Sequence, residues 1–190
     1  MMLYTACFVS PVGKLLLAEK NSALAGLWIE GQKYFLGLYN GTPMQEMETP
    51  LLTKTKRWLE AYFSGQRPKI HELPLAPEGS PFRQAVWKTL CAIPYGAVTT
   101  YGEVAQQLAA QLGVRTVSAR AVGGAVGHNP ISIVIPCHRV IGKSGKLVGY
   151  AGGTDIKRAL LRLEGVDVSV FEQTEIAQNP HAKAYGLSSS

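Results

Sequence analysis

The sequence has only three cysteines among its 190 residues, Cys7, Cys91 and Cys137. They lie far apart, and none belongs to a C-x-x-C pair or to a Cys/His spacing typical of zinc ligands. Such a set excludes a disulfide framework and is typical of a chain in a reducing compartment. We therefore expect no metal site, and the pattern leaves room for one reactive thiol.

The sequence also lacks an apolar run of membrane-spanning length and a charged-then-apolar leader after Met1. Hydrophobic residues still make up 46% of the chain, and charged residues only 17%. This composition excludes disorder of the whole chain and suits one ordinary domain or two small ones. We expect a protein of the cytoplasm, or of the nucleus in a eukaryote, without a membrane partner.

Acidic residues are scarce in one part of the chain. Between Ser80 and Gly165 there are ten basic and three acidic residues, a net charge of +7. Residues 1–79 carry +1 and residues 166–190 carry −2, so the excess of +6 belongs to the middle segment. Concentrated positive charge indicates a polyanionic partner such as nucleic acid, although a solvated basic face has the same composition.

Residues 1–79 are predicted to form a small antiparallel sheet with one helix. Three apolar runs, 3–8, 14–20 and 24–29, predict strands, with a turn signal at 10–13. Thr49 and Pro50 predict the start of a helix that Gly65 ends. One face of this helix is predicted to be core: Leu51, Leu52, Thr55, Trp58, Leu59, Tyr62 and Phe63. Repeated prolines place a domain boundary at 66–80.

Residues 80–165 are predicted to form a mainly helical domain. Ser80-Pro81 opens one helix, Thr100 and Glu103 form a capping box for a second helix, and Ser118 or Thr116 caps a third. The last two helices, joined by a glycine-containing turn, indicate a helix-turn-helix. The expected fold class is α+β with a winged-helix-like second domain. Residues 166–190 are predicted to be a polar, partly disordered tail.

The third of these helices lacks bulk. It reads SARAVGGAVG from 118 to 127, and Arg120 is its only long side chain. Gly123 and Gly124 inside a helix cost about 1 kcal/mol each relative to alanine. Close packing against a neighbouring helix would explain them. The alternative is a slim helix that enters a narrow groove of a partner.

Cys137 and His138 follow a β-branched run, 131–135, which predicts a buried strand that ends at Pro136. A cysteine beside a histidine and the cationic Arg139, at a turn, is typical of a reactive thiolate. Neighbouring strand residues point to opposite faces of a sheet. His138 therefore reaches the thiol only if the backbone turns after Pro136, or through a water.

A histidine that acts as a base needs a partner to orient its second nitrogen, and a carboxylate does this best. The basic segment has only three acids. Glu103 is expected in the capping box and Asp155 at a helix N-terminus. Glu164 is therefore the candidate partner of His138.

The run from Pro136 to Val140 resembles the active-site signature of the O6-alkylguanine-DNA alkyltransferases, also called methylated-DNA–protein-cysteine methyltransferases. The resemblance covers about Ser80 to Gly165, whereas residues 1–79 match only in layout. Further matches in the same order are Tyr101, Arg120-Ala121-Val122-Gly123-Gly124, Asn129-Pro130, Ile135–Ile141, Gly149-Tyr150, Gly152-Gly153, Lys157 and Leu163-Glu164-Gly165.

The resemblance implies DNA repair without a cofactor. The damaged base is flipped out of the duplex, and the O6-alkyl group of guanine moves irreversibly to a cysteine, once per molecule. O4-alkylthymine is left open as a further substrate. The implied roles are Cys137 as acceptor, His138 as base through a water, Glu164 as its orienting partner, Asn129 as hinge residue, and Tyr101 as donor to the leaving guanine.

The same resemblance implies the binding residues. The carbonyl groups of Cys137 and Val140 accept from the exocyclic amine of the guanine. Tyr150, Ala151 and Lys157 lie at the base pocket. The slim helix enters the minor groove of double-stranded DNA. Arg120 fills the gap that the flipped base leaves, and the other residues expected at the DNA are Thr100, Ser118, Ala121, Gly123 and Gly124. A monomer is expected.

Two positions depart from the family pattern. Ala151 stands where the family often has serine, so a hydroxyl contact is lost while the backbone N–H remains. Ser132 stands where some relatives have proline, which leaves open how large an alkyl group is tolerated. The zinc ligands that some relatives carry near the N-terminus have no counterpart here.

Two other classes of function remain as alternatives. A cysteine hydrolase would use Cys137, His138 and Glu164 over repeated turnovers, but it would need neither the slim helix nor the basic excess. A non-enzymatic lesion binder of the alkyltransferase-like group would share the helix-turn-helix. Such proteins replace the cysteine, commonly with tryptophan, and Cys137 argues against that class.

Overall fold

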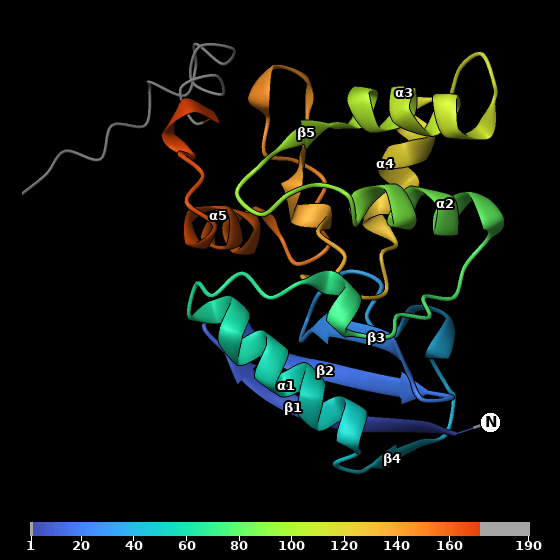
Figure 1. The fold of residues 1–190 in the computed structure, drawn as a ribbon, viewed down its shortest axis with the longest axis vertical. Coiled ribbons are helices and arrows are strands. Elements are labelled where there is room, and N and C mark those ends of the chain that lie inside the picture. The colour runs from blue at the N-terminus through green and yellow to red at the C-terminus, as the bar shows by residue number, and fades with distance from the viewer. Residues whose placement is uncertain (1, 172–190) are drawn as a thin grey trace, which may run out of the picture.

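The computed structural model describes residues 2–171, and the predicted tail beyond Phe171 lies outside the described residues. A sheet with one helix forms one half of the molecule, and a cluster of helices forms the other (Figure 1). The predicted α+β class, with a small sheet followed by a helical domain, is confirmed. No helix among residues 2–171 is long and apolar enough to cross a membrane.

The sheet contains the three predicted strands, β1 (Leu3–Ser10), β2 (Gly13–Lys20) and β3 (Ala23–Ile29), paired antiparallel. A short fourth strand, β4 (Met44–Glu46), pairs parallel to β1, so the strand order is β3-β2-β1-β4. The sequence did not predict β4, because three residues without apolar alternation give no periodic signal.

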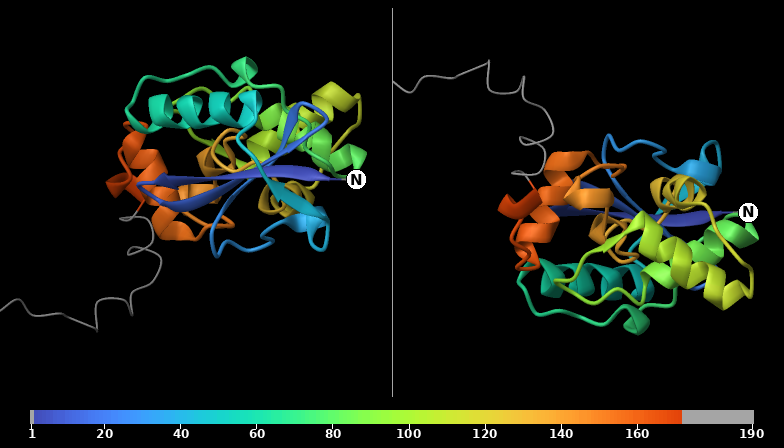
Figure 2. Two further views of the ribbon diagram at one scale, coloured as in Figure 1. Left: turned by 90° about the horizontal axis from the view of Figure 1, so that it is seen from below. Right: turned by 90° about the horizontal axis from the view of Figure 1, so that it is seen from above.

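The helix α1 (Pro50–Phe63) covers one face of this sheet (Figure 2). The Thr49 side chain accepts the backbone N–H of Leu52, as its predicted cap position requires. The opposite face of the sheet is covered by the segment around a 3₁₀ turn, Gly37–Tyr39, whose Tyr39 packs edge-on against Trp28. Both faces of the sheet are therefore buried.

The second half is built from α2 (Pro81–Leu90), α3 (Tyr101–Leu112), α4 (Ala119–Gly127) and α5 (Thr154–Leu163). Two-residue strands β5 (Thr99–Thr100) and β6 (Val140–Ile141) pair parallel. The capping box of Thr100 and Glu103 is present, and Ser118, not Thr116, caps α4. Further 3₁₀ turns are Ile70–Glu72, Cys137–Arg139 and Lys143–Gly145.

The prediction of a strand over 131–135 is wrong. Ile131 forms a single bridge to Leu27, and the chain then turns, with a φ of 71° at Ile133 and a hydrogen bond of 3.0 Å from the Ile135 N–H to the Ile131 carbonyl. These side chains are fully buried all the same. The apolar run signals burial, and burial is satisfied here by a turn in the core.

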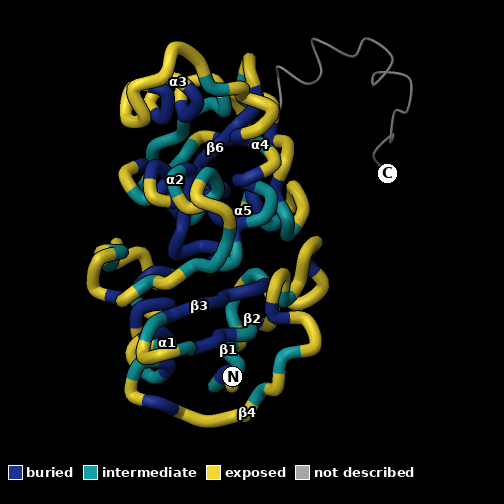
Figure 3. The backbone as a smooth tube through the Cα atoms, turned by 90° about the vertical axis from the view of Figure 1, so that its right-hand side faces the viewer, coloured by how far each residue is buried: buried dark blue, intermediate teal, exposed yellow. Residues whose placement is uncertain are grey.

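The two halves share one core. The free edge of β3 bonds to Pro74 through Leu24 and to residues 130–132 through Leu27. Leu27 belongs to the same buried cluster as Trp87 of α2, and buried backbone runs through both halves (Figure 3). The beginning of the predicted tail also packs, since Val168 is buried beside Leu161. An ordered beginning is compatible with the predicted partial disorder of the tail, which stays a prediction for the residues beyond Phe171.

Candidate active site

Cys137 lies at the start of the 3₁₀ turn Cys137–Arg139, between the buried turn and β6. The backbone therefore turns directly after Pro136, but His138 makes no hydrogen bond to the thiol among residues 2–171, so the route through a water stays open. The thiol is only 3% exposed. Asn129 donates from Nδ2 to the Cys137 Sγ at 3.1 Å, and the same amide donates to the Ile135 carbonyl at 2.9 Å. The amide thus ties the thiol to the turn that precedes it.

His138 and Glu164 form a buried pair. Nε2 of His138 lies 2.7 Å from Oε1 of Glu164, and both side chains have no exposed surface. Burial lowers the pKa of His138 below its ordinary value, against the hydrogen bond and charge of Glu164, which raise it. The ring is therefore neutral at neutral pH and donates from Nε2, which leaves Nδ1 with a lone pair. Nδ1 is buried and has no hydrogen-bond partner among residues 2–171.

Glu164 stays ionised although it is buried. Burial opposes its charge, but hydrogen bonds from His138 and Arg139 outweigh this and hold the pKa of the carboxyl far below its usual range. Arg139 donates from Nε to Oε2 at 2.9 Å and from Nη2 to Oε1 at 3.0 Å. The other two acids of the segment lie as expected, Glu103 in the capping box and Asp155 in the first turn of α5.

The thiol is neutral in the resting protein. Burial raises the pKa of Cys137, against the hydrogen bond from Asn129 and the charge of Lys157, which lower it. Lys157 is fully buried and donates to the carbonyl groups of Val140 at 2.6 Å and Val148 at 2.7 Å. Burial lowers the pKa of Lys157 to about 8. A base is therefore needed to generate the thiolate near neutral pH.

Tyr101, the first residue of α3, reaches the same carbonyl as Lys157. Its hydroxyl donates to the Val148 carbonyl at 3.1 Å, and a β-carbon at Gly149 would overlap with that hydroxyl. Burial raises the pKa of Tyr101 to about 12, so the hydroxyl is protonated and able to donate. Tyr150 is buried with its ring edge-on to His138, at 6.5 Å between centroids. Ala151 is half-buried.

The helix α4 presents small residues to solvent. Ser118, Arg120, Ala121 and Gly124 are exposed, whereas Thr100 is half-buried. A β-carbon at Gly124 would meet nothing within 4 Å, and one at Gly123 would make an ordinary contact of 3.8 Å with the Tyr101 ring. Close packing inside the protein therefore explains neither glycine. Of the two explanations that the sequence left open, the one that remains is a slim helix that enters a narrow groove of a partner.

Three groups at the site were not predicted: Tyr62, Gly96 and the guanidinium of Arg139. Tyr62 donates to Glu164 Oε1 at 2.7 Å, and the Gly96 N–H donates to Oε2 at 3.0 Å. The sequence placed Tyr62 on the core face of a helix, and helical periodicity does not indicate what a hydroxyl binds. Arg139 was noted only as nearby charge. Its position directly after His138 is the signal that could have identified it.

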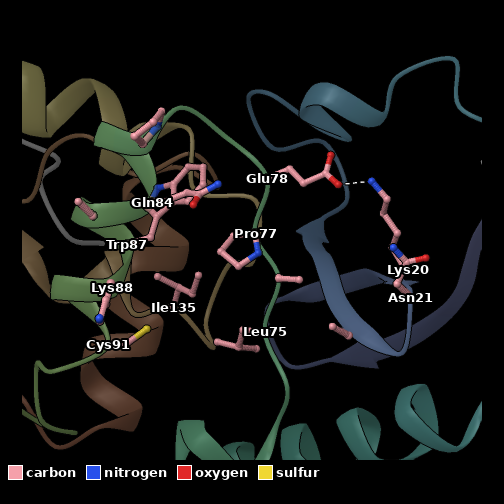
Figure 4. A pocket seen from close by; sticks show the side chains of 14 residues that line it. Lys20, Asn21, Leu75, Pro77, Glu78, Gln84, Trp87, Lys88, Cys91 and Ile135 are labelled. Carbon is pink, nitrogen blue, oxygen red and sulfur yellow. Dashed lines mark hydrogen bonds and ion pairs between the residues drawn. The ribbon is translucent and has the colours of Figure 1, made fainter.

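The other two cysteines lie outside this network, and neither is fully buried. Cys91 lines a cavity of about 800 Å³ between α2 and the β2–β3 turn, where Lys20 and Glu78 form an ion pair (Figure 4). Burial raises the pKa of the Cys91 thiol, so it is neutral too. Cys137 alone of the three has a histidine–carboxylate pair beside it.

Comparison with known proteins identifies the family of this chain. Residues 81–166 match the family model of the 6-O-methylguanine DNA methyltransferase DNA-binding domain, and residues 3–77 match that of its ribonuclease-like domain. The methylated-DNA–protein-cysteine methyltransferase of Haemophilus influenzae is 41% identical over 86% of this chain and 87% of its own. That of Mycobacterium bovis is 44% identical over 90% of this chain and its whole length.

Solved structures show the same relationship. The crystal structure of Mycobacterium tuberculosis OGT in complex with DNA has a TM-score of 0.75 and 40% identity, covering 88% of this chain and 98% of that one. The O6-methylguanine-DNA methyltransferase of Pyrococcus kodakaraensis has a TM-score of 0.58 at 26% identity, covering 87% and 100%. With both domain models matched along most of its length, the chain belongs to the 6-O-methylguanine DNA methyltransferase family.

Proposed function

We propose that this protein repairs duplex DNA by accepting the alkyl group of a flipped O6-alkylguanine on Cys137, once per molecule. The observation that carries the proposal is the buried thiol with an amide donor on Sγ and a neutral histidine–carboxylate pair next to it. An in-stack base cannot present its O6 substituent to a buried thiol, so the base has to leave the duplex.

His138 acts as the base through a water. Its Nε2–H is held by Glu164, so Nδ1 is the nitrogen that takes up the thiol proton. The S–C bond forms as the C–O6 bond breaks, and the electron pair of that bond stays on the guanine. The guanine takes up one proton and the cysteine becomes a thioether. A thioether is not hydrolysed under these conditions, which makes the protein a single-turnover enzyme.

The groups that bind the leaving guanine surround Val140 and Val148. Tyr101 donates a proton or hydrogen bond to the guanine as the C–O6 bond breaks. The carbonyl groups of Cys137 and Val140 accept hydrogen bonds from the exocyclic amine of the guanine. The Cys137 carbonyl already accepts the Val140 N–H, and the Val140 carbonyl already accepts Lys157, so each has one lone pair left for the amine. Lys157 therefore holds one of these acceptors in place, and the N–H of Ala151 donates to O6.

The helix α4 enters the minor groove, where bulk would clash. Gly124 is exposed, and a β-carbon at Gly123 would lie 3.8 Å from the Tyr101 ring, so a slim surface lies close to the proposed reaction site and supports this. Arg120 fills the gap in the base stack. Ser118, Ala121 and Thr100 line the same contact.

Other features of the proposal come from the sequence and stay predictions. These are the division into residues 1–79, 80–165 and 166–190, a monomeric state, and a location in the cytoplasm or, in a eukaryote, the nucleus. No cofactor takes part in the proposed reaction.

The test uses the intact protein and a duplex with a single O6-methylguanine, followed by intact mass and by restored guanine. The expected result is a gain of one methyl per molecule, lost in Cys137→Ala and kept in the matched control Cys91→Ala, with DNA binding retained in both. Turnover beyond one equivalent would indicate a hydrolase, and binding without a mass gain would indicate a lesion binder; either result contradicts the proposal.

A further inference from the structure

Tyr62, on α1 of the sheet-containing half, reaches into the centre of the catalytic pair. Its hydroxyl donates to Glu164 Oε1 at 2.7 Å and lies 3.4 Å from His138 Nε2. His138 bonds to that same oxygen at 2.7 Å. The three side chains are at most 3% exposed. Tyr62 of the sheet-containing half and His138 of the helical half thus donate to the same oxygen of Glu164.

The position of the Tyr62 hydroxyl is set by packing. Its ring stacks on Trp58 at 5.6 Å and meets Phe63 and Tyr95 edge-on at 5.3 and 6.0 Å between centroids. Burial and the charge of Glu164 raise the pKa of Tyr62 far above its ordinary value. The hydroxyl therefore remains protonated and acts as a donor to the carboxylate.

The remaining positions on Glu164 are also occupied. Oε2 accepts the Gly96 N–H and the Arg139 Nε, and Oε1 accepts the Arg139 Nη2 in addition to Tyr62 and His138. The carboxylate is thereby fixed in rotation. Its strength as an acceptor for His138 depends on how many other donors share its charge.

We infer that Tyr62 is a positioning residue of the alkyl-transfer site: its hydroxyl holds Glu164 Oε1 so that His138 keeps Nε2 on the carboxylate and Nδ1 available to the thiol. This inference rests on the proposed role of His138 as base. It also makes the N-terminal half a part of the active site, which the cysteine signature alone does not indicate. The alternative is that Tyr62 only fills the core between the halves.

The experiment compares Tyr62→Phe with Tyr95→Phe. Tyr95 is a matched control, because its ring packs against Tyr62 but its hydroxyl donates to the Leu163 carbonyl at 3.0 Å. Single-turnover methyl transfer from saturating O6-methylguanine duplex is measured from pH 5 to 8.5, with DNA affinity and melting temperature measured in parallel. Tyr62→Phe is expected to slow transfer on the order of tenfold, a part of the roughly 10²–10⁴-fold that a positioned base supplies.

Tyr62→Phe is also expected to move the acid limb of the rate profile to higher pH. With one donor fewer, Glu164 attracts the imidazolium more strongly. The other titratable or charged groups that face His138 stay unchanged in both variants: Cys137 and Arg139 on its own turn, Glu164 and Lys157 at α5, and Tyr150. Tyr95→Phe is expected to keep the wild-type rate, and both variants are expected to keep the wild-type DNA affinity.

A purely structural role would lower the melting temperature and change the rate equally at all pH values; an unmoved acid limb in Tyr62→Phe overturns the inference. If Tyr62→Phe does not fold, site-specific replacement of Tyr62 by 2,3-difluorotyrosine keeps the ring and strengthens the donor. The acid limb should then move to lower pH, and no movement again overturns the inference. Wild-type protein that fails to accept methyl contradicts the proposed function instead, so the two failures are distinguishable.

Discussion

The Asn129 amide is hydrogen-bonded directly to the thiol of Cys137, at 3.1 Å between Nδ2 and Sγ. The other end of the amide, Oδ1, accepts the N–H of Ile131 at 3.0 Å. One buried side chain therefore holds both the beginning of the buried turn and the nucleophile at its end. This relationship links the stability of the turn to the reactivity of the thiol.

Asn129→Ala is expected to lower the free energy of unfolding by about 1–3 kcal/mol, because the buried N–H of Ile131 loses its partner. The same change should slow alkylation of Cys137, since the amide no longer lowers its pKa. Urea unfolding and the methyl-transfer rate check the two effects. Asn40→Ala, at an exposed position, is the control. Unchanged stability in Asn129→Ala would contradict the role assigned to the amide.

The transfer rate of the wild-type protein is expected to be more than half of its plateau value at pH 6.5 and to reach its midpoint only at lower pH. Burial holds the pKa of His138 below 6.5, and the base is active only when neutral. Protonation is therefore half complete only below the pH at which an exposed histidine is half charged. Single-turnover rates from pH 4.5 to 8, with circular dichroism to confirm folding, test this. A midpoint of the acid limb at or above 6.5 would contradict a buried His138 with a lowered pKa as the base.

Gly124→Ala is expected to stabilise the free protein and weaken its binding to duplex DNA. Alanine in a helix interior is favoured by about 1 kcal/mol over glycine, and the added methyl meets nothing within 4 Å in the protein. In a tight groove the same methyl would clash with the DNA and weaken the binding free energy by about 1.4 kcal/mol or more, which lowers the affinity roughly tenfold. Thermal melting and a binding titration measure the two effects. An unchanged affinity for duplex DNA in Gly124→Ala would contradict the proposal that α4 enters the minor groove.

Arg120→Ala is expected to slow repair in duplex DNA about tenfold or more, while the reaction with free O6-alkylguanine base keeps its rate. Flipping costs a few kcal/mol, and only the duplex reaction needs the arginine to compensate for it. Arg57→Ala, on α1 in the other half of the molecule, removes the same charge as a control (Figure 1). Equal loss on duplex and free base would be inconsistent with a stacking role.

Much of the architecture could be read from local signals. Thr49, Ser80, Thr100 and Ser118 each accept a backbone N–H at the start of a helix, as expected from residue types that compete well for such groups. Counting acids in the basic segment pointed to Glu164, and its carboxylate lies 2.7 Å from His138. These predictions depended on short-range geometry or on elimination within a small set.

Failures arose where an apolar residue has more than one way to be buried. The run 131–135 is apolar enough for a strand, yet Ile133 has a φ of 71° because the chain turns back inside a core that β3, α2 and α4 already enclose. An apolar run can be buried in several backbone conformations. The choice among them depends on neighbours from distant parts of the chain.

Local sequence patterns were enough to locate the helix starts, the concentrated charge and the cysteine signature, and the signature indicated the family. Three features became evident only in the tertiary structure. The Tyr62 hydroxyl and His138 bond to the same carboxylate of Glu164, and Arg139 donates two hydrogen bonds to it. Cys137 lies in a turn. The difference arises from the distance along the chain over which each interaction acts. Caps and signatures act over a few residues, whereas the Tyr62–Glu164 contact joins residues 102 positions apart, and only folding brings them together.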